Sequence, residues 1–357
     1  MDGYQLIALT IFLMSTGYLL WRASTQVRRQ RYSYRQIPFG PSDLWLTAEK
    51  SSDKRERPRA TLVGVAVGDA LGAPRESLPV WLTRWRYGAS PRLSRGVFRF
   101  MRRRGTITDD TQLTLLTARC LGSDGRFDNE AFLCGLRQWV DYRIGEGKAT
   151  LQAAMAGGDE SKLDRKSQGN GAAMRIAPIA LAANNDIERM LDLVYQNGAL
   201  THPNPEAIAG AECIARLLAA CLRSEEGHFE IREAIESILP RRFSEDLPHW
   251  RNRLESALRA ADSAEPGLAE IGTSGWVFNT VAATIYLLAR HKTDFAAGLT
   301  ELFQVGGDVD TIAAIYGSVV GALAGMGPFR PWVSQVQGTP ALLEEADRLH
   351  GITCSVS

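Results

Sequence analysis

Apolar residues recur at helical spacing along almost the whole chain, and this constrains the fold more than any other feature of the sequence. In LTLLTARCL, Leu113, Leu116 and Cys120 fall on one face of a helix. No run of residues alternates as a half-buried strand would. We therefore expect one compact all-α domain over residues 58–345. The helical spacing recurs in NEAFLCGLRQWVDY, AAMRIAPIALAA, IERMLDLVYQNGAL, EAIAGAECIARLLAACL, HFEIREAIESIL, RNRLESALRAAD, NTVAATIYLLAR and FAAGLTELFQV.

The composition is that of a globular protein in a reducing compartment. The chain has 357 residues, of which 45% are hydrophobic and 23% charged, so it can bury a substantial core. A net charge of +1 gives no electrostatic reason to expect a nucleic-acid partner. The five cysteines include no CxxC pair, which argues against a disulfide framework or a zinc cluster.

The N-terminal segment has a different character from the rest of the chain. Residues 4–21 carry no charge and have aromatic residues at both ends, which predicts one membrane anchor within residues 1–21. The arginines that follow would place the catalytic domain in the cytoplasm by the positive-inside rule. Residues 22–57 are interpreted as a basic linker and residues 346–357 as a tail. The alternative is a merely amphipathic leader on a soluble cytoplasmic protein, because polar residues dilute the segment, namely Gln5, Thr10, Ser15, Thr16 and Gly17.

One predicted helix near the C-terminus has almost no side-chain bulk on one face. Gly317, Gly321 and Gly325 recur every fourth residue, with alanines around them. Another helix backbone can approach such a surface closely. In a membrane this spacing would indicate a dimerisation face, but two aspartates begin the segment, so we expect a central core helix.

Two acidic clusters stand about two hundred residues apart: TITDDT at residues 106–111 and GGDVDT at residues 306–311. Asp and Thr are common N-caps, so one acid at each helix start would need no further explanation. Two acids at each start are harder to explain by capping, because clustered carboxylates repel unless a cation or a proton neutralises them.

A hard-cation site explains both doublets together. Magnesium and manganese prefer oxygen ligands, and two such ions can orient a substrate and activate a water molecule. If the two helix starts meet, Asp109, Asp110, Asp308 and Asp310 supply four carboxylates. A phosphatase loop of the haloacid-dehalogenase type is a weaker interpretation, because it needs a buried strand before the first aspartate.

Further motifs appear in a fixed order around these clusters: GVAVGDALGAPRES, QGNGAAMRIAPIAL, THPNPEAIAGAECIA and SGWVFNTVAA. Together with TDDT and GGDVDT they closely resemble the ADP-ribosylglycohydrolase family, from about residue 60 to about residue 330. The resemblance implies an all-α fold with a binuclear site for two divalent cations, Mg²⁺ or Mn²⁺. The family usually has GGDTDT, so Val309 is a departure that keeps the ligands.

The resemblance also implies a role for each of the following sets of residues. The metal ligands would be Thr108, Asp109, Asp110, Asp308, Asp310 and Thr311. Asp110 or Asp310 would orient or deprotonate a water molecule, and Glu76 would assist catalysis or gate entry. The substrate would lie against Gly169, Asn170, Gly171, His202 and Trp276.

Some side chains near these motifs have a structural interpretation, either beside a functional one or in place of it. His202 is either a ligand contact or a capping residue, and Phe278 or Trp276 either stacks on a nucleobase or belongs to the core. Asp69 is interpreted as structural, tying a loop to a helix start. Arg175 is expected in a salt bridge at the core edge, with phosphate contact as the alternative. The remaining histidines, His228, His249, His291 and His350, lie in polar stretches and are interpreted as incidental.

The resulting hypothesis is a metal-dependent hydrolase that removes ADP-ribose from a protein side chain, most readily arginine, with serine linkage left open. Its substrate partner would be an ADP-ribosylated protein. The competing hypothesis is an ADP-ribose-binding or immunity-type protein that blocks a cognate ADP-ribosyltransferase without needing catalysis.

Overall fold

The computed structural model describes residues 24–40, 54–76, 78–95, 102–145, 147–225 and 229–356. Extended pairing within these residues is limited to isolated bridges, in agreement with the all-α prediction. The five cysteines are free, as expected. The helices are α2 (Glu56–Gly72), α3 (Val80–Tyr87), α4 (Asp109–Arg119), α5 (Asn129–Tyr142), α6 (Lys148–Ala156), α7 (Ala177–Ala183), α8 (Ile187–Ala199), α9 (Pro205–Arg223), α10 (Ile231–Ile238), α11 (Leu247–Asp262), α12 (Leu268–Ile271), α13 (Val277–His291), α14 (Phe295–Val305), α15 (Val309–Ala324) and α16 (Thr339–Val356), with short 3-10 turns η2 (Glu160–Lys162), η3 (Ala173–Arg175), η4 (Gly327–Phe329) and η5 (Val333–Gln335).

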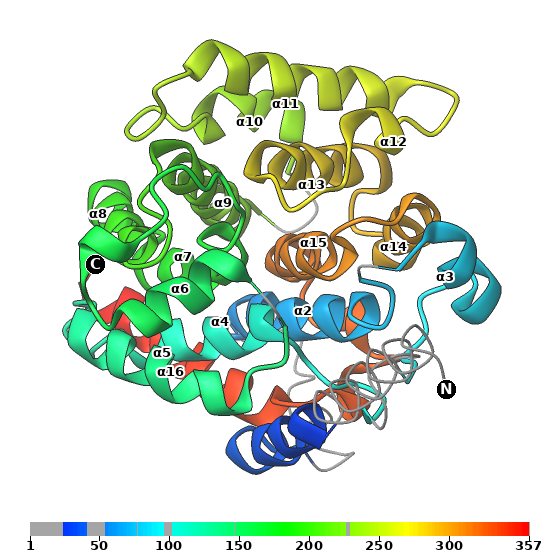
Figure 1. Cartoon of the computed structure of the whole chain (residues 1–357). Helices are drawn as coiled ribbons and strands as arrows, with labels where there is room; N and C mark the ends of the chain where they lie inside the picture. Colours follow the sequence, from blue (N-terminus) through cyan, green and yellow to red (C-terminus); the bar gives the residue numbers. More distant parts are fainter. Residues whose placement is uncertain are drawn as a thin grey trace, which may run out of the picture.

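Helices α2 and α15 cross the centre of the molecule as an antiparallel pair (Figure 1). Their backbones touch through glycines on both helices. A Cβ atom on Gly64 would lie 2.2 Å from the carbonyl oxygen of Gly317, and one on Gly321 would lie 2.1 Å from that of Ala60. The close approach requires glycine at these positions, because any side chain would overlap the facing backbone. The predicted central core helix is therefore confirmed.

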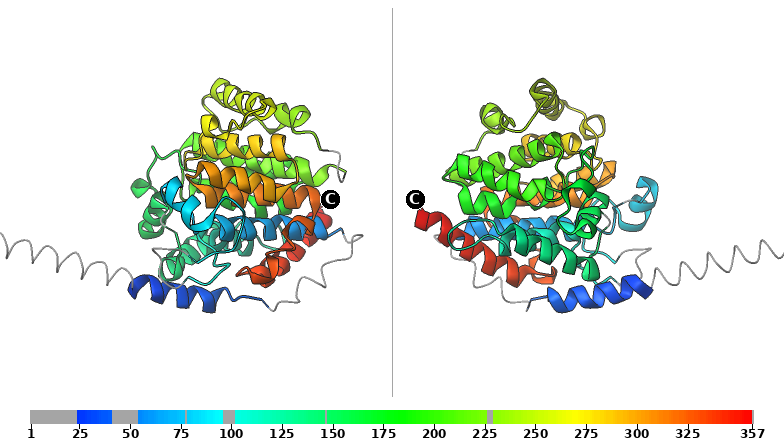
Figure 2. Two further views of the ribbon diagram at one scale, coloured as in Figure 1. Left: turned by 90° about the vertical axis from the view of Figure 1, so that its right-hand side faces the viewer. Right: turned by 60° about the vertical axis from the view of Figure 1, so that its left-hand side comes forward.

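The remaining helices pack as layers on this pair. On one side, α9 and α13 contact α15, and α11 covers α13; on the other side, α4 and α16 contact α2 (Figures 1 and 2). Because the central pair is antiparallel, the C-terminal end of α2 meets the N-terminal end of α15. A Cβ atom on Gly72 would lie 2.4 Å from the Cα atom of Asp310. The fold thus brings the first glycine motif beside the second acidic cluster.

Several helices begin at an Asp or Asn whose side chain caps the free N–H groups of the first turn. Asp186 accepts a hydrogen bond from the N–H of Arg189 at the start of α8, and Asp294 accepts one from Ala297 at the start of α14. Such caps satisfy donors that have no partner inside the helix. They fix where α8 and α14 begin. An acid in the two clusters that served only as a cap would make a hydrogen bond of the same kind.

The chain is helical at both edges of the expected domain. Residues 24–36, assigned to a basic linker, form a helix. Ser33 within this helix and Ile37 directly after it are buried. The hydroxyl of Ser33 lies 3.1 Å from the side-chain nitrogens of Gln112 and Gln337. Residues 346–356, assigned to a tail, continue α16 and bury Leu349. The buried side of the helix over residues 24–36 was not predicted, because the arginines on its surface dominate the local composition.

The prediction of a transmembrane helix is corrected here. In the part of the chain that the structure describes, no helix is both long and apolar enough to cross a membrane. The segment predicted as the anchor, residues 4–21, lies outside the described residues. The prediction rested on the absence of charge, whereas Gln5, Thr10, Ser15 and Thr16 lower the hydrophobicity of the segment.

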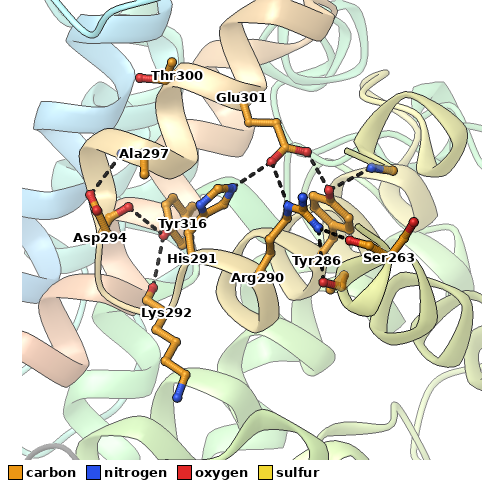
Figure 3. A network of polar contacts seen from close by, with 12 residues as sticks. Ser263, Tyr286, Arg290, His291, Lys292, Asp294, Ala297, Thr300, Glu301 and Tyr316 are labelled. Atoms are coloured by element: carbon orange, nitrogen blue, oxygen red, sulfur yellow. Dashed lines mark hydrogen bonds and ion pairs between the residues drawn. The ribbon is translucent and has the colours of Figure 1, made fainter. Parts of the chain in front are cut away.

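A buried network connects α13 to α14 (Figure 3). Glu301 on α14 accepts a hydrogen bond from the hydroxyl of Tyr286 at 2.5 Å and contacts Nε2 of His291 at 2.7 Å. The Nε atom of Arg290 lies 3.4 Å from the same carboxylate. His291 is therefore not incidental, because it lies against a buried acid.

Candidate active site

A cleft of about 650 Å³ lies where the ends of α2 and α15 meet the N-terminal ends of α4 and α6. Most of the residues predicted for the site lie on its walls, although they come from segments more than two hundred residues apart in the chain. The lining residues are Glu76, Leu78, Asp109, Asp110, Gly147, Lys148, Ala149, Thr150, Ser167, Gly169, Asn170, Gly171, Met174, His202, Ser274, Gly307, Asp308, Asp310 and Thr311.

Asp69 of α2 caps α4 from outside that helix. Its carboxylate accepts hydrogen bonds from the N–H groups of Thr108 and Thr111, at 2.8 and 3.2 Å. It also accepts from both threonine hydroxyls, at 2.8 and 2.5 Å. The structural role predicted for Asp69 is thus confirmed. Because Asp69 satisfies this helix start, Asp109 and Asp110 are not needed as caps.

The second acidic cluster is likewise not explained by capping. Asp308 precedes α15, yet its side chain makes no capping hydrogen bond. Instead, its Oδ2 atom accepts a hydrogen bond from the side-chain amide of Asn170 at 2.6 Å. The same amide also donates to the hydroxyl of Thr280 at 2.9 Å. Asn170 therefore joins the glycine loop to the second acidic cluster.

Burial and mutual repulsion strongly perturb the carboxylates. Burial, followed by the charge of Glu76, raises the pKa of Asp109 to about 7. Burial, followed by the charges of neighbouring acids, raises the pKa of Asp110 and of Asp310 well above the usual range. Burial also raises the pKa of Asp69 to about 6, although its hydrogen bonds oppose the shift. The neighbouring charges that raise the pKa values of Asp109, Asp110 and Asp310 are those of other acids, so ionisation of each one is penalised by the rest.

The donor set suits hard divalent cations. The Oδ1 atoms of Asp110 and Asp310 are buried and have no hydrogen-bond partner, which is costly unless something else satisfies them. Carboxylate and hydroxyl oxygens are the ligands that Mg²⁺ and Mn²⁺ prefer. Within the ranges that the structure covers, no three His, Cys, Asp or Glu side chains already converge as a finished metal site. The oxygens are therefore of the kind that binds these ions, and the carboxylates would have to move closer together to bind one.

The glycine loop before η3 packs against His202. A Cβ atom on Gly171 would lie 2.7 Å from Nε2 of His202, so this position requires glycine. Burial, followed by the charge of Arg175, lowers the pKa of His202 to about 3, and the imidazole is neutral at pH 7. A neutral imidazole has one donor nitrogen and one acceptor nitrogen, so its tautomer decides what it offers to the cleft.

The hydrogen bonds behind His202 fix that tautomer. Arg175 can only donate, and one of its Nη atoms donates to the hydroxyl oxygen of Thr201 at 2.7 Å. The hydroxyl of Thr201 lies 2.7 Å from Nδ1 of His202. Among the described residues, Nδ1 is the acceptor that lies within reach of the Thr201 proton, which favours the tautomer with the ring proton on Nε2. His202 thus presents an N–H donor at the cleft wall.

The comparisons with known proteins agree with this geometry. A sequence model described as ADP-ribosylglycohydrolase matches residues 50–355. The chain belongs to the ADP-ribosylglycohydrolase family. It is 26% identical over 320 residues to the ADP-ribosylarginine hydrolase Tri1 of Pseudomonas putida (strain GB-1), covering 85% of this chain and 80% of that protein.

Two further similarities extend over most of the chain. The ADP-ribosyl-dinitrogen reductase glycohydrolase of Rhodospirillum rubrum is 25% identical over 276 residues, with 76% of this chain and 86% of that protein covered. A solved structure titled ADP-ribosylglycohydrolase-related protein complex has a TM-score of 0.66 and 30% identity, covering 84% of this chain and 99% of that chain. This member of the ADP-ribosylglycohydrolase family therefore also shares the fold of a solved relative.

Two of the predicted site residues do not line the cleft of this ADP-ribosylglycohydrolase. Thr108 is fully buried, and its hydroxyl donates to Asp69 and to Asp110. Trp276 lies beside the glycine loop, pairing through its backbone with Gly169. Phe278, the alternative stacking residue, is buried against Trp250 with ring centroids 4.2 Å apart. Phe278 therefore belongs to the core.

One wall of the cleft in this family member is the loop that leads into α6, and its residues were not predicted from the sequence. Gly145 has a φ of +127°, and a Cβ atom there would lie 1.7 Å from Oδ1 of Asp109. Lys148 and Thr150, at the start of α6, line the cleft. A glycine-rich loop directly before a helix start, GEGKAT, was the signal that pointed to this wall.

Proposed function

We propose that this protein is a divalent-metal-dependent hydrolase that releases ADP-ribose from ADP-ribosylated arginine side chains of proteins. The observation that carries the proposal is the buried cluster of aspartates with unpartnered oxygens on the wall of an open cleft. Such a cluster is unfavourable for folding alone, because buried charges need partners. The choice of arginine is supported by the similarity to an ADP-ribosylarginine hydrolase.

Six oxygen-bearing residues would hold two ions, Mg²⁺ or Mn²⁺: Thr108, Asp109, Asp110, Asp308, Asp310 and Thr311. When bound, the ions supply Lewis-acid polarisation of ribose hydroxyls and of a water molecule. The hydroxyl oxygen of Thr108 would bind an ion through a lone pair while its proton is still donated to Asp69 at 2.8 Å. Asp69 would then continue to hold the backbone of this segment.

The chain's own groups then have distinct roles. The unpartnered Oδ1 atom of Asp110 or Asp310 accepts a proton from the attacking water and orients it toward the anomeric carbon. As the water oxygen bonds to that carbon, the bond from the carbon to the arginine nitrogen breaks, and the released guanidine takes up the proton. Glu76 stands on the cleft wall, where its charge acts on both Asp109 and Asp310. Its position suits a residue that assists this proton transfer or controls entry.

The opposite wall positions the ADP-ribose. Asn170 keeps the glycine loop beside Asp308, so substrate and acids are held in a fixed relation. The Nε2–H group of His202 donates a hydrogen bond to an oxygen of the bound ADP-ribose. Preorganised donors of this kind lower the barrier because they need no rearrangement during the reaction.

The decisive experiment measures ADP-ribose release from an arginine-ADP-ribosylated protein, with Mg²⁺, with Mn²⁺ and with a chelator. We expect release that requires the metal and is lost in Asp308→Ala. Asp141→Ala changes an exposed aspartate at the end of α5 and serves as the matched control. A serine-linked substrate is tested in parallel. Metal-independent release, or release by Asp308→Ala at the wild-type rate, would contradict the proposal.

A further inference from the structure

Helix α3 exposes two tryptophans on one face. Trp81 and Trp85 are 71% and 79% exposed, and their spacing of four residues places them side by side. Tryptophan is usually well buried, and a pair of exposed indoles on one short helix forms an apolar patch. Contiguous exposed apolar surface commonly marks an interaction site.

The base of α3 is firmly attached, so its outer face has a fixed position. Val80 packs against Gly306, two residues before Asp308, and Thr83 is buried. Beneath the helix, the guanidinium of the buried Arg75 lies 4.1 Å from the ring centroid of Phe303 and 5.3 Å from that of Tyr87. Figures 1 and 2 show α3 projecting from the edge of the molecule.

This face lies beside the entrance to the active-site cleft. Glu76 and Leu78 line the cleft, and α3 begins at Val80, two residues after Leu78. A substrate protein would insert only its modified side chain into the cleft. The rest of its surface would remain at the rim, where α3 is available to contact it.

The sequence segment that contains the two tryptophans is strongly basic. Eight arginines and no acid lie between Glu76 and Asp109 in the sequence, although the whole chain has a net charge of only +1. Arg86, Arg92 and Arg95 are exposed on α3 and the loop that follows it. Such a patch would attract an acidic surface and repel a basic one.

We propose that the α3 surface, formed by Trp81, Trp85, Arg86 and Arg92, docks the substrate protein through an acidic segment beside the ADP-ribosylated residue. Tryptophan and arginine are enriched at the centres of protein interfaces, where they contribute much of the binding energy. The inference rests on the proposed hydrolase function, because it assigns the acceptor protein to that site.

The test compares three substrates of the full-length protein. They are a peptide with one ADP-ribosylarginine flanked by glutamates, the same peptide flanked by lysines, and free ADP-ribosylarginine. We expect wild type to prefer the acidic peptide about tenfold in kcat/KM. The Trp81→Ala/Trp85→Ala variant should lose about tenfold on that peptide and remain unchanged on free ADP-ribosylarginine. Met155→Ala/Tyr195→Ala removes two exposed apolar side chains elsewhere and is the matched control.

A charge-reversed variant keeps the proposal testable if the tryptophan variant folds poorly. Arg86→Glu/Arg92→Glu should reverse the preference between the two peptides without affecting free ADP-ribosylarginine. Equal losses on all three substrates, or no loss on the acidic peptide, would overturn the inference. Binding of wild type to anionic lipid vesicles that is lost in Trp81→Ala/Trp85→Ala, with peptide hydrolysis unchanged, would assign the surface to a membrane and overturn it also.

Failure of the proposed function gives a different result. In that case wild type releases no ADP-ribose from free ADP-ribosylarginine with either metal. Peptide binding is therefore also measured by fluorescence anisotropy with fluorescein-labelled peptides in chelator. A preference for the acidic peptide that depends on Trp81 and Trp85 would support the α3 surface, and equal binding of the two peptides would refute it.

Discussion

Two of the buried acidic sites in the described part of the chain have opposite surroundings: the single acid Glu301, and the aspartates of the cleft. Around Glu301, both carboxylate oxygens have partners: Oε1 accepts from Tyr286, and Oε2 contacts His291 and lies 3.4 Å from Arg290 (Figure 3). Around the cleft, Oδ1 of Asp110 and of Asp310 has no partner. The described residues supply partners for both oxygens of Glu301, but they leave one carboxylate oxygen of Asp110 and one of Asp310 without a donor.

A structural buried acid and a functional one therefore differ in their hydrogen-bond partners and not in their burial. A buried carboxylate with hydrogen-bond donors and cations contributes to a defined packing. A cluster of carboxylates without a cation destabilises the fold, and such clusters occur where function requires them. The two groups should therefore respond in opposite ways to removal of an acid.

The largest expected effect is on activity. Asp310→Asn should reduce kcat by about a thousandfold, because it removes one of the oxygens available to orient water, and losses of this order follow removal of one preorganised group. Its thermal stability in chelator should equal or exceed that of wild type, since asparagine is neutral at every pH and needs no proton to be buried among the other acids. Metal-dependent release of ADP-ribose and thermal unfolding are the two measurements. Activity within tenfold of wild type would contradict the assignment.

The same kind of change at Glu301 should affect stability instead. Glu301→Leu leaves Arg290 and His291 beside an apolar side chain and should lower the free energy of unfolding by about 3 kcal/mol. Glu270→Leu alters an exposed glutamate on α12 and is the control. Urea denaturation gives the difference. The folded Glu301→Leu protein should keep wild-type kcat, and a thousandfold loss would show that the two groups are not distinct.

The third prediction concerns pH in the absence of metal. The pKa of Asp69 is raised to about 6 and that of Asp109 to about 7, from an ordinary value of 3.8. Raised carboxyl pKa values mean that the folded state holds protons more tightly than the unfolded state. The stability that these protons provide is fully present below pH 3.8 and is lost as the pH rises through 6 to 7.

In chelator, the protein should therefore be less stable at pH 8 than at pH 5.5 by about 2 kcal/mol, the size expected for a shift of more than one pKa unit. Urea denaturation at the two pH values measures this difference. Bound Mg²⁺ should remove it, because the cation favours the ionised acids, and the same titration with Mg²⁺ corrects for all other groups. Greater stability at pH 8 in chelator would show that the acids are already neutralised by the protein.

From the sequence, it was easier to predict that the four aspartates lie together than to predict the contacts that hold them there. Asp109, Asp110, Asp308 and Asp310 were recognisable because capping a helix needs one acid and each segment has two. Asp69 was predicted to tie a loop to a helix start, but α4 was not named as that helix. A cap that comes from another helix leaves no pattern in the local sequence. Glycines recur every fourth residue on both α2 and α15. Only those of α15 were interpreted as a surface for close helix packing, so the matching glycines of α2 were not predicted.

Contacts between distant segments account for the remaining differences. Arg175 was expected in a salt bridge, yet within the described residues its guanidinium donates hydrogen bonds to the neutral oxygens of Gly171, Asn197 and Thr201. His291 was interpreted as incidental because it stands in a polar stretch, whereas its partner Glu301 lies ten residues away, across a turn into the next helix. Local periodicity shows which face of a helix is buried, but it does not show what that face meets.

The smallest expected effect tests whether Arg175 and Thr201 act through His202. Thr201→Val removes the hydroxyl that donates to Nδ1, so His202 should no longer be confined to the Nε2–H tautomer, and ADP-ribose affinity should fall about tenfold, the loss of one hydrogen bond to substrate. Nitrogen-15 NMR of labelled histidine distinguishes the tautomers, and the chain has only five histidines. Thr201→Ser keeps the hydroxyl and should restore both readouts. If His202 in Thr201→Val stays in the Nε2–H form while affinity falls, the contact is structural, because packing alone would then explain the loss.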